Sequence, residues 1–270
     1  MTTGHDVAEA RAASRDARST ARSVSVVIPA FNEEAILKDT VAHVHARLAA
    51  DHDLDFFEII VIENGSTDAT LRSAEELSAG YDEVRVIVLA TADYGAALKT
   101  GFHAATGEVI VNFDADYYDM DFLAAALRVD ADIVVAAKSI LGSHDARVLL
   151  RRIVSRGFGW MVRTLLSVRV TETHGMKLFH RAAIAELLPL VHSTKDLFDT
   201  ELIARSEWAG LEIRELPIRT EEMRHSRSGI IRRVPRTIGG LIRLRRKLRA
   251  ARSKRVPPSS GADSSLDVAV

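Results

Sequence analysis

Two aspartates one residue apart, Asp114 and Asp116, form the motif with the clearest chemistry in this sequence. They directly follow the apolar run 109–113, so we expect them at the carboxyl end of a buried strand. In an extended Asp-x-Asp both carboxylates can approach one Mg²⁺ or Mn²⁺, which prefers oxygen ligands and keeps positions free for phosphate. The cation would offset negative charge on such a phosphate. An isolated pair of this kind is more often a solvated acidic turn, so the interpretation needs support from elsewhere in the chain.

Three other polar or glycine-rich segments also follow apolar runs directly. They are Pro-Ala-Phe-Asn-Glu-Glu at 29–34, Glu-Asn-Gly-Ser-Thr-Asp at 63–68 and Tyr-Gly-Ala-Ala-Leu-Lys-Thr-Gly at 94–101. Each is an ordinary turn by itself. Together with the aspartates they make a specific pattern, because ligands of parallel sheets bind at the carboxyl ends of the strands.

The segments that must position these loops alternate between apolar runs and helical periodicity. We expect strands at 24–29, 58–62, 84–89, 109–113 and 132–137, and helices at 33–49, 68–77, 96–105, 122–127 and 147–166. Ser66 or Thr67 would cap the helix at 68–77. Strands that are apolar throughout are covered on both faces, so the pattern predicts an α/β fold with a mostly parallel sheet between two helical layers.

Composition narrows the class of protein further. Of 270 residues, 47% are hydrophobic and 27% charged, which supports a sizeable core and excludes collagen, coiled coil and wholesale disorder. The absence of cysteine excludes disulfides, thiolate metal sites and a cysteine nucleophile. No apolar run reaches the roughly 18–20 residues that cross a bilayer, and residues 1–22 lack the apolar core of a secretory signal. These features predict a cytoplasmic protein without a membrane span.

The C-terminal region is strongly basic. Between residues 219 and 255, fourteen Lys and Arg stand against two Glu, a local net charge of +12 in a chain whose total is −1. Val234, Ile238, Leu241, Ile242 and Leu248 follow helical spacing among these basic residues. The pattern is typical of an amphipathic helix on an anionic membrane surface. Nucleic acid is the rival partner, but interleaved aromatic residues for base stacking are absent, so we expect no nucleic acid.

The strand-end segments together resemble the family 2 glycosyltransferases of GT-A fold, and most of all their dolichyl- or polyprenyl-phosphate mannosyl- and glucosyltransferases. The resemblance runs from about Val24 to Arg245 and continues in Ser-Arg-Gly-Phe at 155–158, Gly-Met-Lys-Leu-Phe at 175–179 and Glu-Leu-Pro-Ile at 215–218. It implies inverting, metal-dependent transfer of a hexose to a polyprenyl or dolichyl phosphate at the cytoplasmic face of a membrane. Mannose from GDP-mannose is the first expectation and glucose from UDP-glucose the second.

The resemblance also implies roles for individual residues. The residues implied for the nucleoside are Pro29, Phe31, Glu33, Glu63, Gly65, Ser66 and Asp68. Those implied for the metal and diphosphate are Asp114, Ala115 and Asp116, with Mg²⁺ or Mn²⁺ on the two aspartates. Lys138 would touch a phosphate or sugar oxygen, and Arg156 would meet the lipid phosphate. A basic loop with Arg224, Arg227 and Ser228 would close over the diphosphate.

The chain departs from the family pattern at three places, Asn64, Asp93 and Tyr118. Asn64 stands where a second aspartate is common, which leaves Glu63 as the carboxylate that could accept from a base N–H. Asp93 stands in a segment that is usually Asn-x-Gly-x-Gly and could meet a sugar hydroxyl. Tyr118 replaces a glutamine that assists the metal, so Asp119 or water would substitute. These departures also allow a second interpretation, a degenerate nucleotide-sugar-binding protein that docks on a membrane partner. The presence of both Asp114 and Asp116 argues against that interpretation.

The acceptor is a second open question. A phosphate acceptor needs little activation, because its second pKa is about 6. A soluble hydroxyl acceptor would need a carboxylate base, for which Asp199 and Glu201 are candidates. Both also suit the first turn of a helix, and that interpretation is favoured.

The chain thus divides into four predicted parts. They are a flexible extension at 1–22, the α/β domain at 23–228, the basic amphipathic helix at 229–255 and a disordered tail at 256–270.

Overall fold

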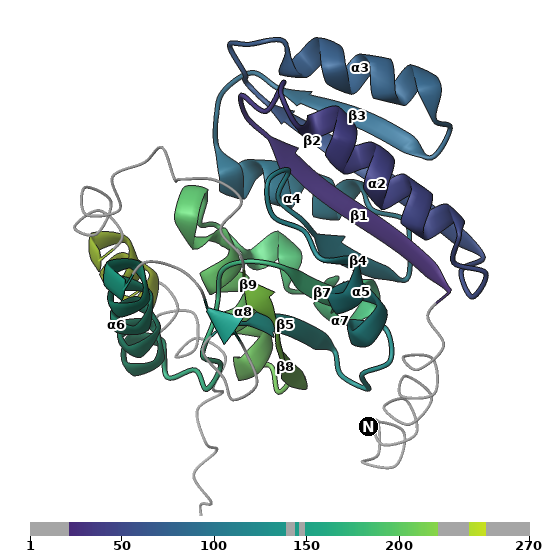
Figure 1. Ribbon diagram of the computed structural model, residues 1–270. Coiled ribbons are helices and arrows are strands. Elements are labelled where there is room, and N and C mark those ends of the chain that lie inside the picture. The colour runs from purple at the N-terminus through teal and green to yellow at the C-terminus, as the bar shows by residue number, and fades with distance from the viewer. Residues whose placement is uncertain (1–21, 139–143, 146–148, 221–237, 247–270) are drawn as a thin grey trace, which may run out of the picture.

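A computed structural model describes residues 22–138, 144–145, 149–220 and 238–246 of the chain, with the backbone alone for 144–145, 149–156, 158, 196 and 219–220. Seven strands form one sheet in the order β3-β2-β1-β4-β7-β5-β8 (Figure 1). Their bounds are β1 Ser23–Ala30, β2 Phe56–Asn64, β3 Val84–Leu89, β4 Val109–Asn112, β5 Ile133–Ala137, β7 Lys177–His180 and β8 Ile213–Pro217. β7 is antiparallel to β4 and β5, and the other pairs are parallel. A small second sheet pairs β6 (His144–Asp145) with β9 (Arg219–Thr220).

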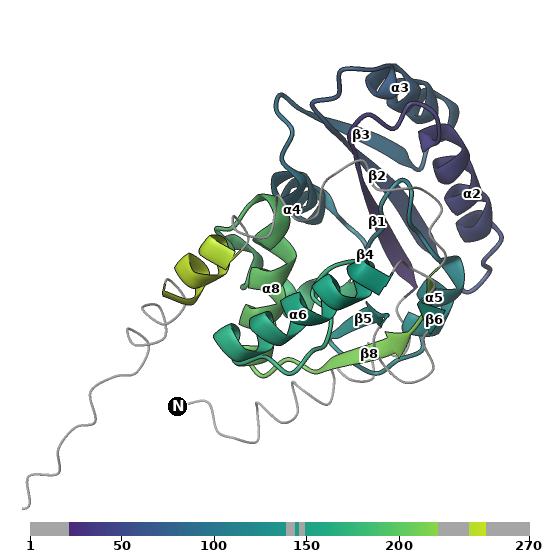
Figure 2. The same cartoon turned by 60° about the vertical axis from the view of Figure 1, so that its left-hand side comes forward.

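The strands form because long runs of β-branched residues can be buried on both faces of the sheet. All residues of β4 and β5, and nearly all of β1 and β2, are buried. Helices α2 (Leu37–Ala49), α3 (Thr70–Gly80) and α5 (Met120–Ala126) pack on one face. Helices α4 (Tyr94–Ala104), α6 (Leu149–Leu166) and α8 (Phe198–Trp208) pack on the other (Figures 1 and 2). The predicted mostly parallel sheet between two helical layers is therefore confirmed.

The remaining helical segments are short. They are α7 (Arg181–Ile184) and two 3-10 helices, η1 (Leu188–Leu190) and η2 (Lys195–Leu197). η2 lies between β7 and α8 along the chain and packs against α4. It therefore joins the C-terminal half of the domain to the helix that follows β3.

Helices α4 and α5 begin two residues earlier than expected, at Tyr94 and Met120. Two other predicted helices begin later than expected, and side-chain hydrogen bonds explain why. The helix expected from Glu33 begins at Leu37, because the backbone N–H of Glu33 donates to Thr70 Oγ1 in a loop. The helix expected from Asp68 begins at Thr70, where the Asp68 carboxylate accepts from the Thr70 N–H. Ser66 and Thr67, the expected caps, instead contact the loop after β1.

Of the basic helix predicted at 229–255, the structure describes residues 238–246, which are helical. Leu241 and Leu244 are buried in the core that covers the α4 and α8 face of the sheet, and Gly240 packs on Leu197. Ile242 remains 42% exposed. Leu241, one of the three residues of the predicted membrane-facing stripe in this segment, therefore packs against the domain, while the rest of 229–255 lies outside the described residues. Among those described residues no helix is both long enough and apolar enough to cross a membrane.

Candidate active site

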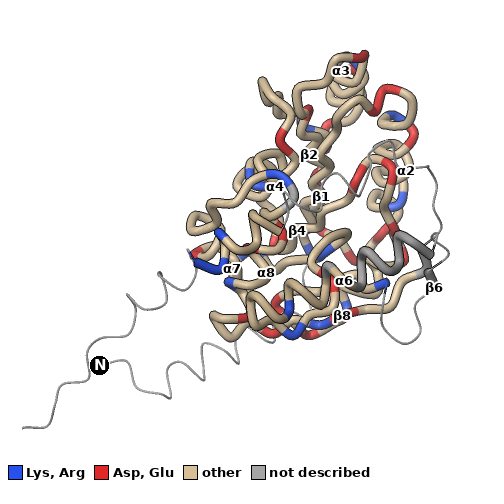
Figure 3. The backbone as a smooth tube through the Cα atoms, turned by 90° about the vertical axis from the view of Figure 1, so that its left-hand side faces the viewer, with Lys and Arg blue, Asp and Glu red and all other residues tan. Residues whose placement is uncertain are grey.

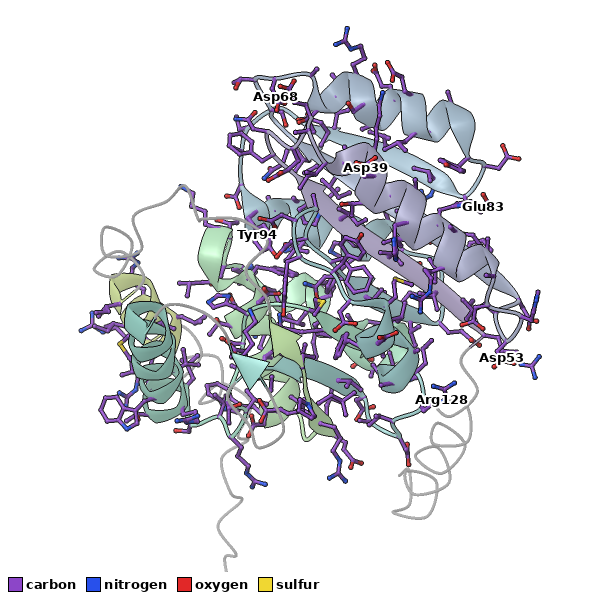
Figure 4. All side chains as sticks on the ribbon, viewed as in Figure 1. Asp39, Asp53, Asp68, Glu83, Tyr94 and Arg128 are labelled. Atoms are coloured by element: carbon purple, nitrogen blue, oxygen red, sulfur yellow. The ribbon has the colours of Figure 1, made fainter. Side chains whose placement is uncertain are left out.

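The carboxyl ends of β1, β2, β3 and β4 lie at one edge of the sheet, since these strands are mutually parallel. Asp68 and Tyr94, both labelled in Figure 4, mark this edge. The order of strands reverses between β1 and β4, which is where open α/β sheets bind ligands. All four segments singled out from the sequence are therefore brought to the expected place.

The loops after β1 and β2 are hydrogen-bonded to each other. Asn32 adopts a left-handed backbone conformation with φ of 56°. Its N–H donates to Ser66 Oγ at 3.1 Å, and its side-chain oxygen accepts from the Thr67 N–H at 2.8 Å. Ser66 thus fixes the distance between the two loops.

Glu63 and Gly65 shape the second loop from within. Glu63 is 3% exposed, and its carboxylate accepts from the N–H groups of Ser66 at 2.6 Å and Gly65 at 3.3 Å. Gly65 has φ of +71°, and a Cβ there would lie 3.0 Å from the backbone of Thr91 and Ala92. The carboxylate that was expected to face a base therefore organises its own loop, and its contact with a base stays a prediction.

The other residues expected at the nucleoside differ in exposure. Phe31 is 44% exposed at the end of β1, so its ring is available for stacking. Pro29 is buried inside β1. Burial would raise the pKa of Asp68, but hydrogen bonds from Thr70 and the N–H of Glu34 outweigh it and hold that pKa below its ordinary value.

The aspartate pair forms a tight turn, which corrects the expected extended geometry. The N–H of Asp114 donates to the carbonyl of Tyr117 at 3.0 Å, and the N–H of Tyr117 returns a bond to Asp114 at 3.1 Å. The carbonyl of buried Ala115 accepts from Thr40 Oγ1 of α2 at 2.7 Å. Ala115 therefore anchors the turn to α2, and Asp116 is left exposed at its tip.

Asp114 sits in a cluster of like charges. The hydroxyl of Tyr94, at the start of α4, donates to Asp114 Oδ1 at 2.9 Å. Burial, together with the carboxylates of Asp116 and Asp199, raises the pKa of Asp114 to about 6, against the lowering effects of Tyr94 and Lys177. Because burial and repulsion between carboxylates disfavour the charged form of Asp114, the site favours a cationic ligand.

A buried lysine also belongs to the site. Lys177, in β7, is completely buried, and its ammonium lies 3.4 Å from Asp199 Oδ2 and donates to the Gly175 carbonyl at 2.7 Å. Asn112 donates to the same carbonyl at 3.2 Å. Asp199 Oδ1 and Asn112 Oδ1 are buried without a hydrogen-bond partner among the described residues. Asp199 therefore belongs to this cluster and does more than begin a helix.

Lys138 lies beside the aspartate turn, and its expected contact with a phosphate or sugar oxygen stays a prediction. Its ammonium lies 4.6 Å from the centre of the Tyr117 ring, in the geometry of a cation–π contact. A Cβ on Gly175 would come 3.8 Å from the same ammonium. Lys138 therefore stands between the turn and the loop before β7.

Some residues expected at the site have side chains outside the described structure, and others have a different role from the one expected. Arg156 lies on α6, but its side chain is outside the described part, as are Arg224, Arg227 and Ser228.

Asp93 caps α4 through the Ala96 N–H at 3.0 Å and also accepts from the Lys195 N–H at 2.7 Å. Asp119 caps α5 through the N–H groups of Asp121 and Phe122. Asp119 thus serves its own helix, which argues against the substitute metal-ligand role considered from sequence.

The residues at the turn fit a divalent cation. Two carboxylates supply the hard oxygen ligands that Mg²⁺ and Mn²⁺ prefer, and positive charge would relieve the repulsion felt by Asp114. Within the described ranges no three His, Asp or Glu side chains gather into a protein-only metal site. Asp114 and Asp116 would therefore hold the ion together with water or phosphate oxygens.

Sequence reasoning missed three members of the site. Tyr94 is the first residue of a segment that the sequence analysis selected for its glycines. Asn112 is a polar residue within an apolar strand, and Lys177 entered only as part of the motif at 175–179. A lysine or asparagine inside an apolar strand is itself a signal, because such groups are rarely buried without a partner.

Comparison with known proteins identifies relatives of this arrangement. The family model described as Glycosyl transferase family 2 matches residues 25–188. Glycosyltransferase AglD of Haloferax volcanii is 31% identical over 81% of this chain, which spans only 36% of that protein. The dolichyl-phosphate beta-glucosyltransferase of Drosophila melanogaster is 30% identical, over 74% of this chain and 67% of that protein. The enzyme of the same name in Homo sapiens is 27% identical, over 77% of this chain and 70% of that protein.

A solved structure shares the fold. Glucosyl-3-phosphoglycerate synthase from Mycobacterium tuberculosis, in complex with UDP, superposes with a TM-score of 0.62 at 20% identity, covering 86% of this chain and 83% of that one. The same synthase has been solved with Mn²⁺, UDP and its product, with a TM-score of 0.60. At this identity the likeness shows the fold, which is the GT-A arrangement expected from the sequence.

Proposed function

Because the chain belongs to glycosyl transferase family 2, we propose that it transfers glucose from UDP-glucose to a polyprenyl phosphate at a membrane surface. The chain is a glycosyltransferase, so the expectation of a binder without activity falls away. The names of its dolichyl-phosphate relatives favour glucose, the second sugar expected, and GDP-mannose is not confirmed. The observation that carries the proposal is the Asp114–Tyr117 turn, placed beside the joined loops that follow β1 and β2.

The geometry suggests how the donor would lie. The nucleoside would occupy the loops fixed by Asn32 and Ser66, with Phe31 against the base. The diphosphate would then reach Asp116 and Asp114, with Lys138 nearby. A bound Mg²⁺ or Mn²⁺ would neutralise the departing diphosphate. Tyr94 holds Asp114 in place and lowers its pKa, which favours the charged form that such a site needs.

The proposed acceptor requires positioning more than activation. A phosphate monoester carries an oxyanion near neutral pH, because its second pKa is about 6. Its oxygen would attack the anomeric carbon as the bond to UDP breaks, which inverts the configuration at that carbon. Arg156 of α6 is our candidate for neutralising the acceptor phosphate.

A soluble hydroxyl acceptor is the second candidate, and Asp199 is the observation that favours it. Its Oδ1 is buried without a hydrogen-bond partner in the described structure, close enough to Asp114 to influence that group electrostatically. A hydroxyl needs a base of this kind within hydrogen-bond reach. Glu201, the other candidate, accepts instead from Arg205 and from the N–H groups of His192 and Ser193.

A transfer assay with purified protein and Mn²⁺ separates these possibilities. UDP-glucose and GDP-mannose are each offered with polyprenyl phosphate, with the matched polyprenol that lacks phosphate, and with 3-phosphoglycerate. We expect glucose on the polyprenyl phosphate alone. Transfer to 3-phosphoglycerate but not to the lipid would instead establish the soluble acceptor, and mannosyl lipid would reverse the choice of donor.

Membrane contact is proposed for the face that carries α6 and residues 238–246. Trp160 on α6 is 64% exposed and Ile242 is 42% exposed, while Val162, Leu166, Leu241 and Leu244 hold both helices in one core. Exposed Arg243 and Arg246 add positive charge beside Ile242. Tryptophan and basic residues are typical of surfaces that contact the membrane interface.

Point variants test this surface better than truncation, since removing residues after 229 would strip Leu241 and Leu244 from the core. We expect Trp160→Ser combined with Ile242→Ser to reduce flotation with anionic vesicles. Val88→Ser on β3 is the matched control, because Val88 is also exposed, at 54%. Equal flotation of all three proteins would remove this face from the proposal.

A further inference from the structure

A pocket of about 430 Å³ lies at the opposite end of the sheet from the active site, where β2 and β3 begin. Its lining is formed by Asp55, Phe56, Phe57, Glu58, Asp82, Glu83, Arg85 and Thr106. Figure 4 shows Glu83 at this end of the molecule, with Asp53 from the loop before β2, and Tyr94 and Asp68 at the other. The proposed donor site therefore lies away from this pocket.

The chemistry of the pocket is acidic with an aromatic wall. Four of its residues are carboxylates and one is a cation. That cation, Arg85, is already paired with buried Glu58 through its Nε at 2.9 Å and its Nη2 at 2.5 Å. Asp55 and Glu83 remain partly exposed, with side-chain exposures of 70% and 41%, although Glu83 also contacts His45. The ring of Phe56 is 45% exposed beside them.

Carboxylates next to an exposed aromatic ring are suited to one kind of group in particular. A guanidinium can donate to a carboxylate with its edge and stack on an aromatic ring with its face. The pocket is thus better matched to arginine than to an anion. Figure 3 shows both acidic and basic positions on α2 and α3, so the negative charge here comes from the carboxylates of the pocket itself.

The described chain begins beside this pocket, at Arg22. The N–H groups of Asp55 and Phe56 donate to the Arg22 carbonyl at 2.8 and 3.2 Å, and Arg22 Nη1 lies 3.8 Å from Asp55 Oδ1. Residues 1–21 therefore join the domain at the rim of the pocket. In that segment Arg11, Arg15 and Arg18 continue from Arg22 at intervals of four, three and four residues.

This spacing places all four arginines on one face of a helix. Six alanines within residues 8–21 also favour helix. With a rise of about 1.5 Å per residue, Arg18 and Arg15 in a helix would lie roughly 6 and 10 Å along the axis from Arg22. An isolated segment of this length is only marginally helical in water, so it needs a surface to dock on.

We propose that residues 1–21 dock their arginine face, led by Arg18 and Arg15, in the acidic pocket formed by Asp55, Phe56, Asp82 and Glu83. The extension predicted from sequence to be flexible is thereby held against the side of the domain remote from the active site. The rival occupants of the pocket are a basic segment of a second copy and the basic C-terminal region of the same chain.

Hydrogen–deuterium exchange of the full chain at low salt tests the proposal through the peptide amides of residues 8–21. Exchange in this segment should accelerate about fivefold in Arg15→Gln/Arg18→Gln and in Asp55→Asn/Asp82→Asn, as expected for the loss of two surface ion pairs. The arginine variant leaves the described domain untouched, so it remains informative if the pocket variant fails to fold. Asp121→Asn, at an exposed carboxylate on α5, is the control and should exchange as the wild type does.

Charge reversal supplies the decisive comparison. Arg18→Glu should accelerate exchange, and adding Asp82→Arg should restore the slow rate. Equal exchange in the wild type and in every variant would overturn the proposal. Protection that disappears on dilution would assign the pocket to a second copy, and protection that disappears only on removal of residues 247–270 would assign it to the C-terminal region. Both of these outcomes also overturn it.

Discussion

The hydroxyl of Tyr94 donates to Asp114 Oδ1 at 2.9 Å, and this bond joins the segment after β3 to the turn after β4. Burial and the neighbouring carboxylate of Asp114 raise the pKa of Tyr94 well above its ordinary value, so the tyrosine keeps its proton and remains a donor. The glycine-rich segment and the aspartate pair are consequently parts of a single site.

Tyr94→Phe should shift the acid limb of activity to higher pH. Asp114 must lose its proton to act, and its pKa is about 6, so kcat/KM should rise as the pH increases through that value. The bond from Tyr94 lowers this pKa, and its loss should move the limb up by about one pH unit. The profile is measured at limiting Mg²⁺, with Tyr81→Phe as a control remote from the site. An unchanged limb would mean that Asp114 does not govern it.

Asp116→Ala should abolish transfer without unfolding the protein. Asp116 is exposed at the tip of its turn, so removing its carboxylate leaves the core intact while a cation loses one of its two protein ligands. Transfer and Mn²⁺-dependent stabilisation by UDP are measured together with the melting temperature. Asp121→Ala, at a 93% exposed aspartate, is the matched control. Normal turnover by folded Asp116→Ala would remove the metal-dependent mechanism.

Lys177→Met should destabilise the fold and the site together. Lys177 is fully buried and Asp199 is 3% exposed, so the variant would leave a buried carboxylate without its cation. Breaking such a pair costs about 3–5 kcal/mol. Urea unfolding should show this loss, and Lys177→Met/Asp199→Asn should recover part of it. If the double variant is no more stable than the single one, the two side chains do not act as a pair.

Glu58→Gln should reduce stability most at neutral pH. Burial would raise the pKa of Glu58, but hydrogen bonds from Ser25, Thr106 and Arg85 outweigh it and lower that pKa. A carboxylate with a depressed folded pKa stabilises the protein above its unfolded pKa, and this contribution disappears as the pH falls through the folded value. Unfolding experiments should therefore show that the difference between wild type and Glu58→Gln shrinks toward acid pH. A difference that is independent of pH would show that Glu58 acts through packing alone.

Arg156→Ala should weaken the use of the acceptor far more than the binding of the donor. The basis is the position of Arg156 on α6 and the need for a cation near the attacking phosphate. KM for polyprenyl phosphate and the Kd for UDP with Mn²⁺ are compared, with Arg163→Ala of the same helix as control. An equal loss of affinity for UDP would place Arg156 at the donor.

The sequence predicted the parallel half of the sheet well, because β1, β2, β3 and β4 are mostly apolar runs of ordinary length. It did not reveal that Lys177 lies in a strand between β4 and β5, since pairing between strands distant in the chain leaves no local signal. The shape of the Asp114–Tyr117 turn was also mistaken, because it depends on the contact of Ala115 with Thr40, 75 residues away. The helix cap at Ser66 was predicted wrongly for a similar reason, because Ser66 Oγ accepts a hydrogen bond from the N–H of Asn32 in another loop.

The position of β7 has a consequence for folding. β4 and β5 are not neighbours in the sheet, and four residues, Lys177–His180, supply the hydrogen bonds that connect them. During synthesis, β1 to β4 can pair as soon as they emerge, whereas β5 must wait some forty residues for its link to them. Local opening of this one short strand would divide the sheet between β4 and β5, while contacts of α4 with η2 and α8 would still hold the two parts together. The cohesion of the domain therefore rests on β7 and on this helical layer together.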